Sequence, residues 1–417
     1  MASDRLYDLA FLFRKLKLWN RIPETALYAI RFDDGEIGYC SVMGELGEHL
    51  CLCVYLGQSG YASYQFILNG AAVLSFYDQM ELIAAQNSLQ CAYESKDYLG
   101  DEELDELRDY CRRIGKNLRG KNACPHFLRF MPGKYPRPIE SAEEESKTKL
   151  ALEASIWLNG ALDDTDISKM LQELWNSPTR IPALVKKDGK WMVEAEPLPA
   201  AERIWPAPVF ENEVLAAKIR KLRKSGTWET GTFYLTEAVL DEEEDDREPY
   251  FPLMLLNVEQ KNEMIVCSVP GSVDTPKLML QELGEQMVDM KLCPKKILAA
   301  DDRAYALLSD FCKKAGIRLE REDDLPLYEE AREMLYSQME GMDDLAWDEE
   351  DMWDDEPDGE FGEDDAENLD QFLSTLMLMR DEELSTMPRE LVQMIFRMGD
   401  MGYVPDSLIA RLQKLFP

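Results

Sequence analysis

The chain has 417 residues, of which 45% are hydrophobic and 30% are charged, so it can bury more than one hydrophobic core. Its 46 basic and 81 acidic residues give a net charge of −35, which repels nucleic acid and anionic membrane surfaces. We therefore expect neither direct binding of a nucleic-acid backbone nor attachment to a membrane. Part of the acidity is local, because residues 341–367 hold fifteen acidic residues and no Lys or Arg.

The N-terminal segment and the cysteines predict a cytoplasmic protein. Leu6, Leu9 and Phe13 are spaced at helical intervals between charges, which is typical of an amphipathic first helix and not of a signal peptide. No apolar run reaches the roughly 18 residues that a bilayer-spanning helix needs. The nine cysteines are an odd number and several lie in apolar runs such as residues 51–56, which indicates reduced core residues and not a disulfide framework.

The first part of the chain predicts a hairpin followed by alternating strands and helices. The hairpin turns at Asp34-Gly35, and the apolar segment after Glu48 predicts an added strand. The next elements are a helix at 61–80, a strand at 88–95, a helix at 101–115, a strand at 126–133 and a helix at 141–158. A further hairpin turns at Asp188-Gly189.

The second part of the chain predicts a similar series. Its hairpin turns near Lys261-Asn262, and it continues with a helix at 275–292, a strand at 295–302, a helix at 303–316, a strand at 317–321 and a helix at 326–339. The fold class is therefore α+β, with two related α/β-type domains. The predicted divisions are an N-terminal domain at 1–196, a Pro-rich linker at 197–210, a second domain at 211–340, an acidic linker at 341–367 and a small helical module at 368–417.

Two pairs of similar segments indicate an internal duplication. "LRDYCRRIGKNL" from Leu107 is similar to "LSDFCKKAGIRL" from Leu308, and "EIGYCSVMG" from Glu36 is similar to "EMIVCSVPG" from Glu263. The alternative is chance similarity between ordinary αβ units, since a helix, a glycine and a strand are a common connection. A duplication predicts that Cys111 and Cys312 are buried on equivalent helices, each ended by a left-handed glycine.

The segments at 34–57 and 249–335 resemble two successive domains of unknown function in an uncharacterised bacterial protein family. "DGEIGYCSVMGELGEHLCLCVYLG" carries the first resemblance, and the block from "PYFPLMLLNVEQ" to "YEEAREML" carries the second. The resemblance implies a division into two domains. It implies no activity, cofactor or site residue.

The order of elements in the second part is also similar to that of a ribonuclease-H-type domain. Active members hold two metal ions with carboxylates on the first strand and at the end of the fourth strand. The candidates are Asn257 or Glu259 and the pair Asp301 and Asp302; in the first part they are Asp33, Asp34 and Asp97. A complete set of metal ligands is not evident, and turn chemistry explains Asp33-Asp34-Gly35. Whether Asp301 and Asp302 converge in a site is left open.

No other catalytic or metal-binding pattern is complete. The only histidines are His49 and His126, and Cys51 beside His49 is typical of one face of a buried strand. The segment from Asp354 to Asp365 approaches the spacing of an EF-hand calcium loop, but Pro357 and the final aspartate depart from it, and a disordered acidic tether is the alternative. We therefore predict no catalytic residue, no cofactor and no metal ligand.

The leading functional hypothesis is a non-enzymatic interaction or scaffold protein with a protein partner. The alternatives are a divergent ribonuclease-H-like nuclease or phosphoryl-transfer domain, and an acidic mimic of nucleic acid that binds a basic partner. The methionine-rich C-terminal helices predict either the core of a small bundle or a docking face. Five basic residues between Lys218 and Lys224 predict a basic helix that pairs with the acidic runs at 241–246 and 343–365.

Overall fold

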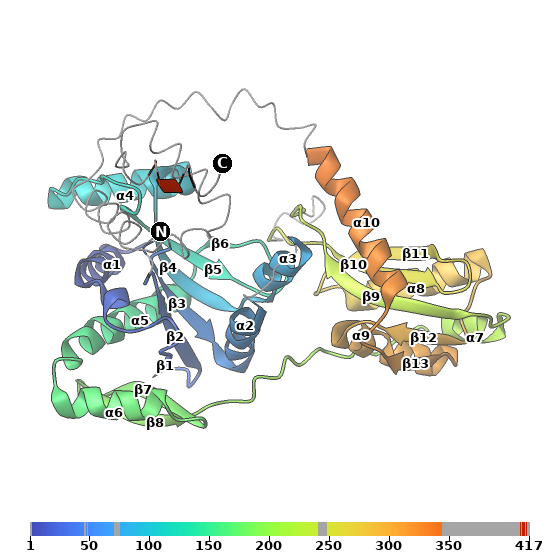
Figure 1. Ribbon diagram of the computed structural model, residues 1–417, viewed down its shortest axis with the longest axis horizontal. Coiled ribbons are helices and arrows are strands. Elements are labelled where there is room, and N and C mark those ends of the chain that lie inside the picture. The colour runs from blue at the N-terminus through green and yellow to red at the C-terminus, as the bar shows by residue number, and fades with distance from the viewer. Residues whose placement is uncertain are drawn as a thin grey trace. The chain divides into compact units, whose positions relative to one another are not determined.

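The computed structural model describes residues 2–45, 47, 49–70, 76–240, 248–343, 409, 411, 412 and 414. Residues 1–347 form one compact unit, which contains two open β-sheets with helices packed against them (Figure 1). The fold is therefore α+β, as predicted. The predicted calcium loop at 354–365, most of the acidic linker and almost all of the C-terminal helical module lie outside the described residues.

The first sheet has the strand order β6-β5-β4-β3-β2-β1-β7-β8. Its strands are β1 (Tyr28–Arg31), β2 (Ile37–Met43), β3 (Cys51–Leu56), β4 (Ser88–Glu94), β5 (Cys124–Phe130), β6 (Arg137–Pro138), β7 (Arg180–Lys187) and β8 (Lys190–Pro197). Neighbouring strands are antiparallel except β1 and β7, which are parallel. The hairpins predicted at Asp34-Gly35 and Asp188-Gly189 are confirmed, and Gly35 and Gly189 adopt the positive φ that such turns require.

Helices pack against both faces of the first sheet. They are α1 (Asp4–Leu16), α2 (Gly57–Gly70), α4 (Asp101–Ile114), α5 (Ala142–Ala161) and α6 (Thr165–Trp175), with short 3₁₀ turns at Leu18–Asn20 and Lys96–Tyr98. Helix α3 (Phe76–Ala85) follows α2 and packs against it. Strand β3 shows why both faces are needed: Leu52 and Val54 enter the core shared with α1, α4 and α5, while Cys51 and Cys53 enter the core shared with α2. No helix in the described ranges combines the length and apolarity needed to cross a bilayer.

The second sheet has the order β11-β10-β9-β12-β13. Its elements are α7 (Glu213–Lys221), β9 (Thr227–Tyr234), β10 (Leu253–Glu259), β11 (Met264–Gly271), α8 (Pro276–Met290), β12 (Lys296–Ala299), α9 (Asp302–Ala315), β13 (Arg318–Arg321) and α10 (Pro326–Asp343). The central strand β9 is antiparallel to β10 and parallel to β12, which in turn is parallel to β13. Helices α7, α8 and α9 pack on one face and α10 packs on the other, so the sheet is buried on both sides (Figure 1).

Strand β9 was not predicted from the sequence, although it is the central strand. The ribonuclease-H-type hypothesis took the strand with Asn257 and Glu259 as the first of the sheet, whereas that strand is β10 and follows β9. The first strand therefore offers Glu229, and not Asn257 or Glu259, as its acidic residue. Whether this sheet is a ribonuclease-H-type domain stays a prediction.

The two cysteine helices agree in their caps and differ in their connections. Cys111 in α4 and Cys312 in α9 are buried, and Gly115 and Gly316 end the helices in the left-handed conformation, as predicted. However, α4 connects the antiparallel neighbours β4 and β5, while α9 connects the parallel neighbours β12 and β13. The internal duplication therefore stays a prediction.

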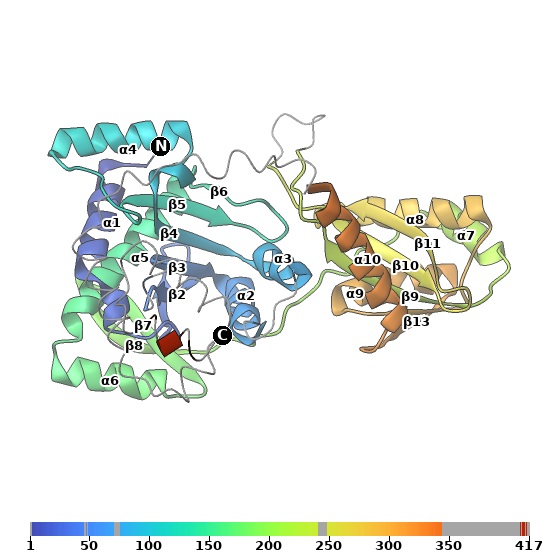
Figure 2. The ribbon, with the colours of Figure 1, turned by 45° about the horizontal axis from the view of Figure 1, so that its top comes forward.

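Helix α3 links the two sheets. Both ribbon views place it between them (Figures 1 and 2), and Met80 and Ala84 of this helix belong to the core cluster of the second sheet. Backbone hydrogen bonds from Tyr135 N–H to the Pro249 carbonyl and from Phe251 N–H to the Gly133 carbonyl join the loop after β5 to the segment before β10. Residues 198–212, where a linker was predicted, contain no helix or strand.

Candidate functional site

The adjacent aspartates at the end of β12 do not form a shared site. The Asp301 carboxylate accepts hydrogen bonds from Thr232 N–H at 2.8 Å, Thr232 Oγ1 at 2.9 Å and Ala304 N–H at 2.7 Å. It therefore caps α9 and fixes the end of β9. Asp302 is instead directed to β13, where Arg321 Nε lies 3.0 Å from its Oδ1. The structure thus assigns the two carboxylates to different contacts.

The other candidate metal-binding side chains also have structural roles. Asn257 is buried, and its Oδ1 accepts a hydrogen bond from Thr230 Oγ1 at 2.9 Å. Asp34 accepts a hydrogen bond from Glu36 N–H at 2.8 Å and pairs with Lys147 at 2.8 Å, as expected of a turn residue. Further candidates lie apart: Glu259 bonds Asn262 in the next hairpin turn, Asp97 bonds Ser95, and Asp33 precedes Asp34 in the first turn. Among the residues that the structure describes, no three His, Cys, Asp or Glu side chains gather as a metal site.

The histidines and cysteines form no nucleophilic pair. His49 Nδ1 lies 3.8 Å from Glu94 Oε1, and His126 Nε2 lies 3.7 Å from Glu103 Oε2. All nine cysteines are free and buried. Burial raises the pKa of the Cys51 thiol well above its ordinary value, which disfavours the thiolate that a nucleophile requires.

One buried acid was missed in the sequence. Glu229 in β9 is only 2% exposed, and its carboxylate accepts hydrogen bonds from Gln260 Nε2 at 2.9 Å and from Tyr328 N–H at 3.0 Å. These bonds tie β9 to the β10–β11 turn and to α10. The enrichment of "TWETGTFY" in threonine and aromatic residues is the signal that would have located this strand.

A buried arginine connects the two sheets. Arg303, at the start of α9, donates to Glu81 of α3 through Nη2 at 2.7 Å and Nη1 at 3.2 Å, and through Nε to Thr232 Oγ1 at 2.8 Å. Its guanidinium also lies 4.6 Å from the ring centre of Tyr234 and 5.2 Å from that of Trp205. Opposite charge outweighs burial here, so the pKa of Arg303 is raised.

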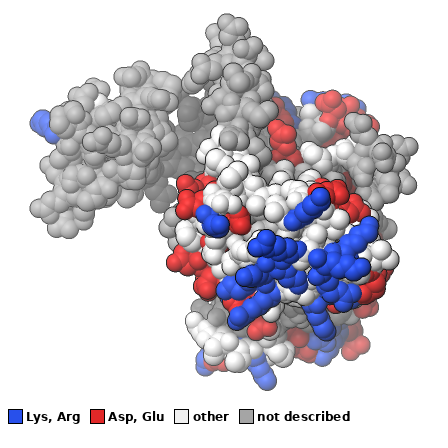
Figure 3. All heavy atoms as spheres, turned by 90° about the vertical axis from the view of Figure 1, so that its right-hand side faces the viewer, with Lys and Arg blue, Asp and Glu red and all other residues white. Residues whose placement is uncertain are grey.

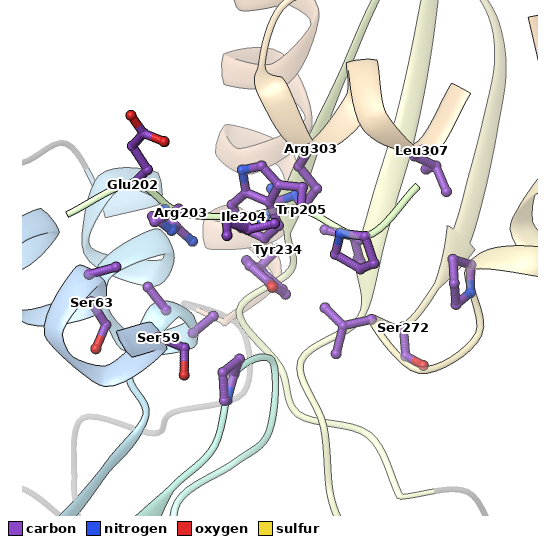
Figure 4. Close-up of a pocket in the computed structure, with 18 of the residues that line it drawn as sticks. Ser59, Ser63, Glu202, Arg203, Ile204, Trp205, Tyr234, Ser272, Arg303 and Leu307 are labelled. Atoms are coloured by element: carbon purple, nitrogen blue, oxygen red, sulfur yellow. The ribbon is translucent and has the colours of Figure 1, made fainter. Parts of the chain in front are cut away.

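Beside Arg303 lies a cavity of about 470 Å³, which we call the inter-sheet cavity. Helices α2 and α3, the segment 202–206 and the second sheet with the starts of α8 and α9 line it (Figure 4). The close-up shows Arg203, Ile204 and Trp205 crossing between the helices of the first sheet and the strands of the second. A second, more polar hollow of about 710 Å³ shares Arg203, Trp205 and Arg303 with it and extends toward Asp301 and Arg321.

Basic side chains gather at the opposite end of the second sheet (Figure 3). Backbone hydrogen bonds from Ser225 to Cys293 and from Arg318 to Lys295 place three segments side by side there. Seven exposed residues of these segments and the adjoining helix ends make no ion pair with any described residue, and we call them the basic face: Lys218, Arg220, Lys221, Arg223, Lys291, Lys295 and Lys313. The acidic runs predicted to pair with the basic helix, at 241–246 and 343–365, lie outside the described residues except for Asp343, so that pairing stays a prediction.

Comparison with known families confirms the predicted pair of successive domains of unknown function. Residues 4–173 match a domain of unknown function (DUF7309), and residues 215–336 match a second domain of unknown function (DUF6930). The sequence has no significant match among curated proteins. The two matched ranges contain most of the first sheet with its helices and nearly all of the second sheet with its helices. The chain therefore carries two successive domains of unknown function, DUF7309 and DUF6930.

Proposed function

We propose that the protein is a non-enzymatic interaction protein whose second domain binds an acidic segment of a partner protein through the basic face. The observation that carries this proposal is the gathering, on one surface of a chain with a net charge of −35, of seven exposed cations that form no ion pair within the described part of the chain. Like charges at close range repel one another, so such a group costs free energy unless a negative charge approaches it. A bound acidic segment removes that cost.

Helix dipoles explain only part of this gathering. Lys218 and Lys221 lie in the last turn of α7 and Lys313 in that of α9, where a cation is favourable. Arg223 and Lys295, however, lie outside any helix. The basic face therefore extends beyond what helix termination requires.

A short acidic protein segment fits this face better than a nucleic acid does. A long polyanion that touched the basic face would continue over the acidic surface of the same chain, which repels it. Proteins that bind single-stranded nucleic acid also place aromatic side chains among their basic residues. The exposed aromatic residues of the described chain are Tyr98, Tyr135 and Tyr305, none of which lies in the segments of the basic face.

The test is fluorescence anisotropy of a labelled ten-residue polyglutamate peptide. We expect binding that weakens as salt rises, and a loss of about tenfold in affinity in the triple variant Arg220→Glu/Lys221→Glu/Arg223→Glu. The matched control reverses three exposed arginines on α4, Arg108, Arg112 and Arg113, with the same change in net charge.

Equal weakening in both triple variants would show that only net charge matters and would refute a local docking surface. Absence of binding at low salt would refute it as well. Tighter binding of a ten-nucleotide single-stranded RNA than of the peptide would indicate that the partner of the basic face is a nucleic acid and not a protein.

A ribonuclease-H-like nuclease or phosphoryl-transfer domain is the second candidate. It is favoured by a sheet in which a hairpin is followed by strands and helices in alternation, with β12 parallel to β9. The acids do not favour it, because two-metal chemistry needs carboxylates that are free to bind metal and Asp301 already accepts three hydrogen bonds. Magnesium-dependent cleavage of RNA that is abolished by Asp301→Asn would establish this candidate in place of the interaction protein.

A cytoplasmic location also belongs to the proposal. Nine buried cysteines without a disulfide are typical of proteins from a reducing compartment. The acidic nucleic-acid mimic has no comparable support, because the acidic runs on which it depends lie outside the described residues.

A further inference from the structure

We infer that the inter-sheet cavity binds a small organic anion, with an apolar or aromatic body in the cavity and one carboxylate or phosphate group on Arg203. Four features carry this inference: the size of the cavity, its apolar walls, an arginine at its edge without a hydrogen-bonded partner among the described residues, and the pairing of Arg303 and Asp301 with other side chains. It is independent of the basic face, which lies at the other end of the second sheet.

The cavity suits the body of a small molecule. Its volume of about 470 Å³ falls within the roughly 300–1,000 Å³ usual for ligand sites. Most of its wall is apolar and comes from helices α2, α3, α8 and α9 and from strand β10: Ala62, Ala84, Leu253, Met279 and Leu307. Ser59 and Ser63 of α2 and Ser272 after β11 add hydroxyl groups at its sides (Figure 4). Such a wall holds an apolar body and orients it with few polar contacts.

Arg203 is the cation that lacks a partner at this site. Its guanidinium lies 4.4 Å from the ring centre of Phe66 and 4.4 Å from that of Trp205. Stacking fixes the plane of the group, yet its N–H donors bond to no residue in the described part of the chain. Burial lowers the pKa of Arg203, and the nearby Glu81 carboxylate offsets that effect only in part. A guanidinium held in this way is prepared for a bidentate bond to a carboxylate or phosphate.

The other charged side chains near the cavity are not available to bind an anionic group of the ligand. Arg303 is paired with Glu81, and Asp301 is saturated by Thr232 and Ala304. Glu202 is exposed and forms no ion pair with any described residue. Arg203 is therefore the cation at the edge of the cavity that has no hydrogen-bonded or ion-paired partner among the described residues.

The test compares the affinities of two fluorescent probes that share an aromatic body and differ in the presence of one anionic group. 1-Anilinonaphthalene-8-sulfonate has an aromatic body and one anionic group, whereas N-phenyl-1-naphthylamine has the same body without the anion. We expect Arg203→Gln to weaken the anionic probe by about tenfold or more and to leave the neutral probe within about twofold. Arg203→Lys keeps the charge without the planar donor pair, so its affinity for the anionic probe should lie between those of the other two proteins.

Two controls separate this site from other cationic surfaces. Arg108→Gln removes an exposed arginine on α4, and the triple reversal on the basic face removes the other cluster that could attract the anion. Both should bind the anionic probe as the unmodified protein does. The inference is overturned if Arg203→Gln weakens both probes equally, if it weakens neither, or if the basic-face variant alone loses the anionic probe. Circular dichroism of each variant checks that it is folded, so that a loss of probe binding is not caused by unfolding.

Discussion

Asp301 and Asp302 are neighbours in sequence with unequal structural roles. Asp301 is the N-cap of α9 and accepts three hydrogen bonds, two of them from Thr232 at the end of β9. Asp302 has an exposed side chain and, within the described ranges, pairs with Arg321 alone. Asp302 can therefore serve as the control in a mutational test of Asp301.

Asp301→Ala should lower the free energy of unfolding by about 2–4 kcal/mol, because it removes a helix cap and leaves the Thr232 donors without an acceptor. Asp302→Ala should change it by less than about 1 kcal/mol, since exposed ion pairs contribute little. Urea unfolding followed by circular dichroism measures both values. Similar losses in the two variants would contradict the structural role given to Asp301.

At the level of elements, a glycine in β9 allows α10 to approach the sheet. A Cβ added to Gly231 would lie 2.3 Å from the ring of Tyr328, which is far inside contact distance. The ring cannot easily move away, because Tyr328 is buried, its N–H bonds Glu229 and its hydroxyl bonds the Thr232 carbonyl. The close approach of β9 and α10 therefore depends on the missing side chain.

Gly231→Ala should destabilise the protein by about 1–3 kcal/mol through this overlap. Gly160→Ala is the control, because the site in α5 has open space for a Cβ and alanine favours the helix by roughly 0.5–1 kcal/mol. Chemical unfolding of the two variants should give shifts of opposite sign. A neutral Gly231→Ala would mean that α10 does not pack as closely as described.

Local signals in the sequence predicted many of these elements. The Asp-Gly turns at 34–35 and 188–189 located two hairpins, because both turns need a positive φ that glycine adopts without cost. The glycines after α4 and α9 located two helix ends for the same reason. Strand β9 was missed because its buried side chains include Glu229, Thr230 and Thr232, whereas the predicted strands were recognised as apolar runs.

The candidate cavity could not be predicted in the same way. Arg203 and Trp205 lie in a proline-rich segment without helix or strand, so no periodicity indicates which side chains turn inward. Phe66 and Glu81 come from α2 and α3, more than a hundred residues earlier in the chain. The contacts arise only from the packing of α3 on the second sheet, which no local pattern encodes.

At the scale of the whole unit, the Glu81–Arg303 pair is more buried than the Lys134–Asp274 and Arg137–Glu248 pairs that also connect the two domains, with Arg303 9% and Glu81 22% exposed at their side chains. Glu81→Ala should cost about 2 kcal/mol, below the value for a fully buried pair, because it leaves Arg303 without its counter-ion. The double variant Glu81→Met/Arg303→Met should be more stable than Glu81→Ala, since it removes both charges together. Thermal unfolding of the unmodified protein, Glu81→Ala and the double variant measures their relative stability. A double variant less stable than Glu81→Ala would contradict the prediction.

The parallel pairing of β1 with β7 limits the order in which the chain can fold during synthesis. Ala29 pairs with Ala183, so one edge of β1 has no partner until a segment made about 150 residues later leaves the ribosome. At a typical rate of synthesis of about 5–20 residues per second, that edge of β1 remains unpaired for roughly 8–30 s. An unpaired edge is where chains aggregate, and a nascent chain that stalled before residue 180 would expose it continuously. Truncation between β6 and β7 should therefore yield aggregates, whereas a chain that ends after Pro197 has every strand of the first sheet available for pairing.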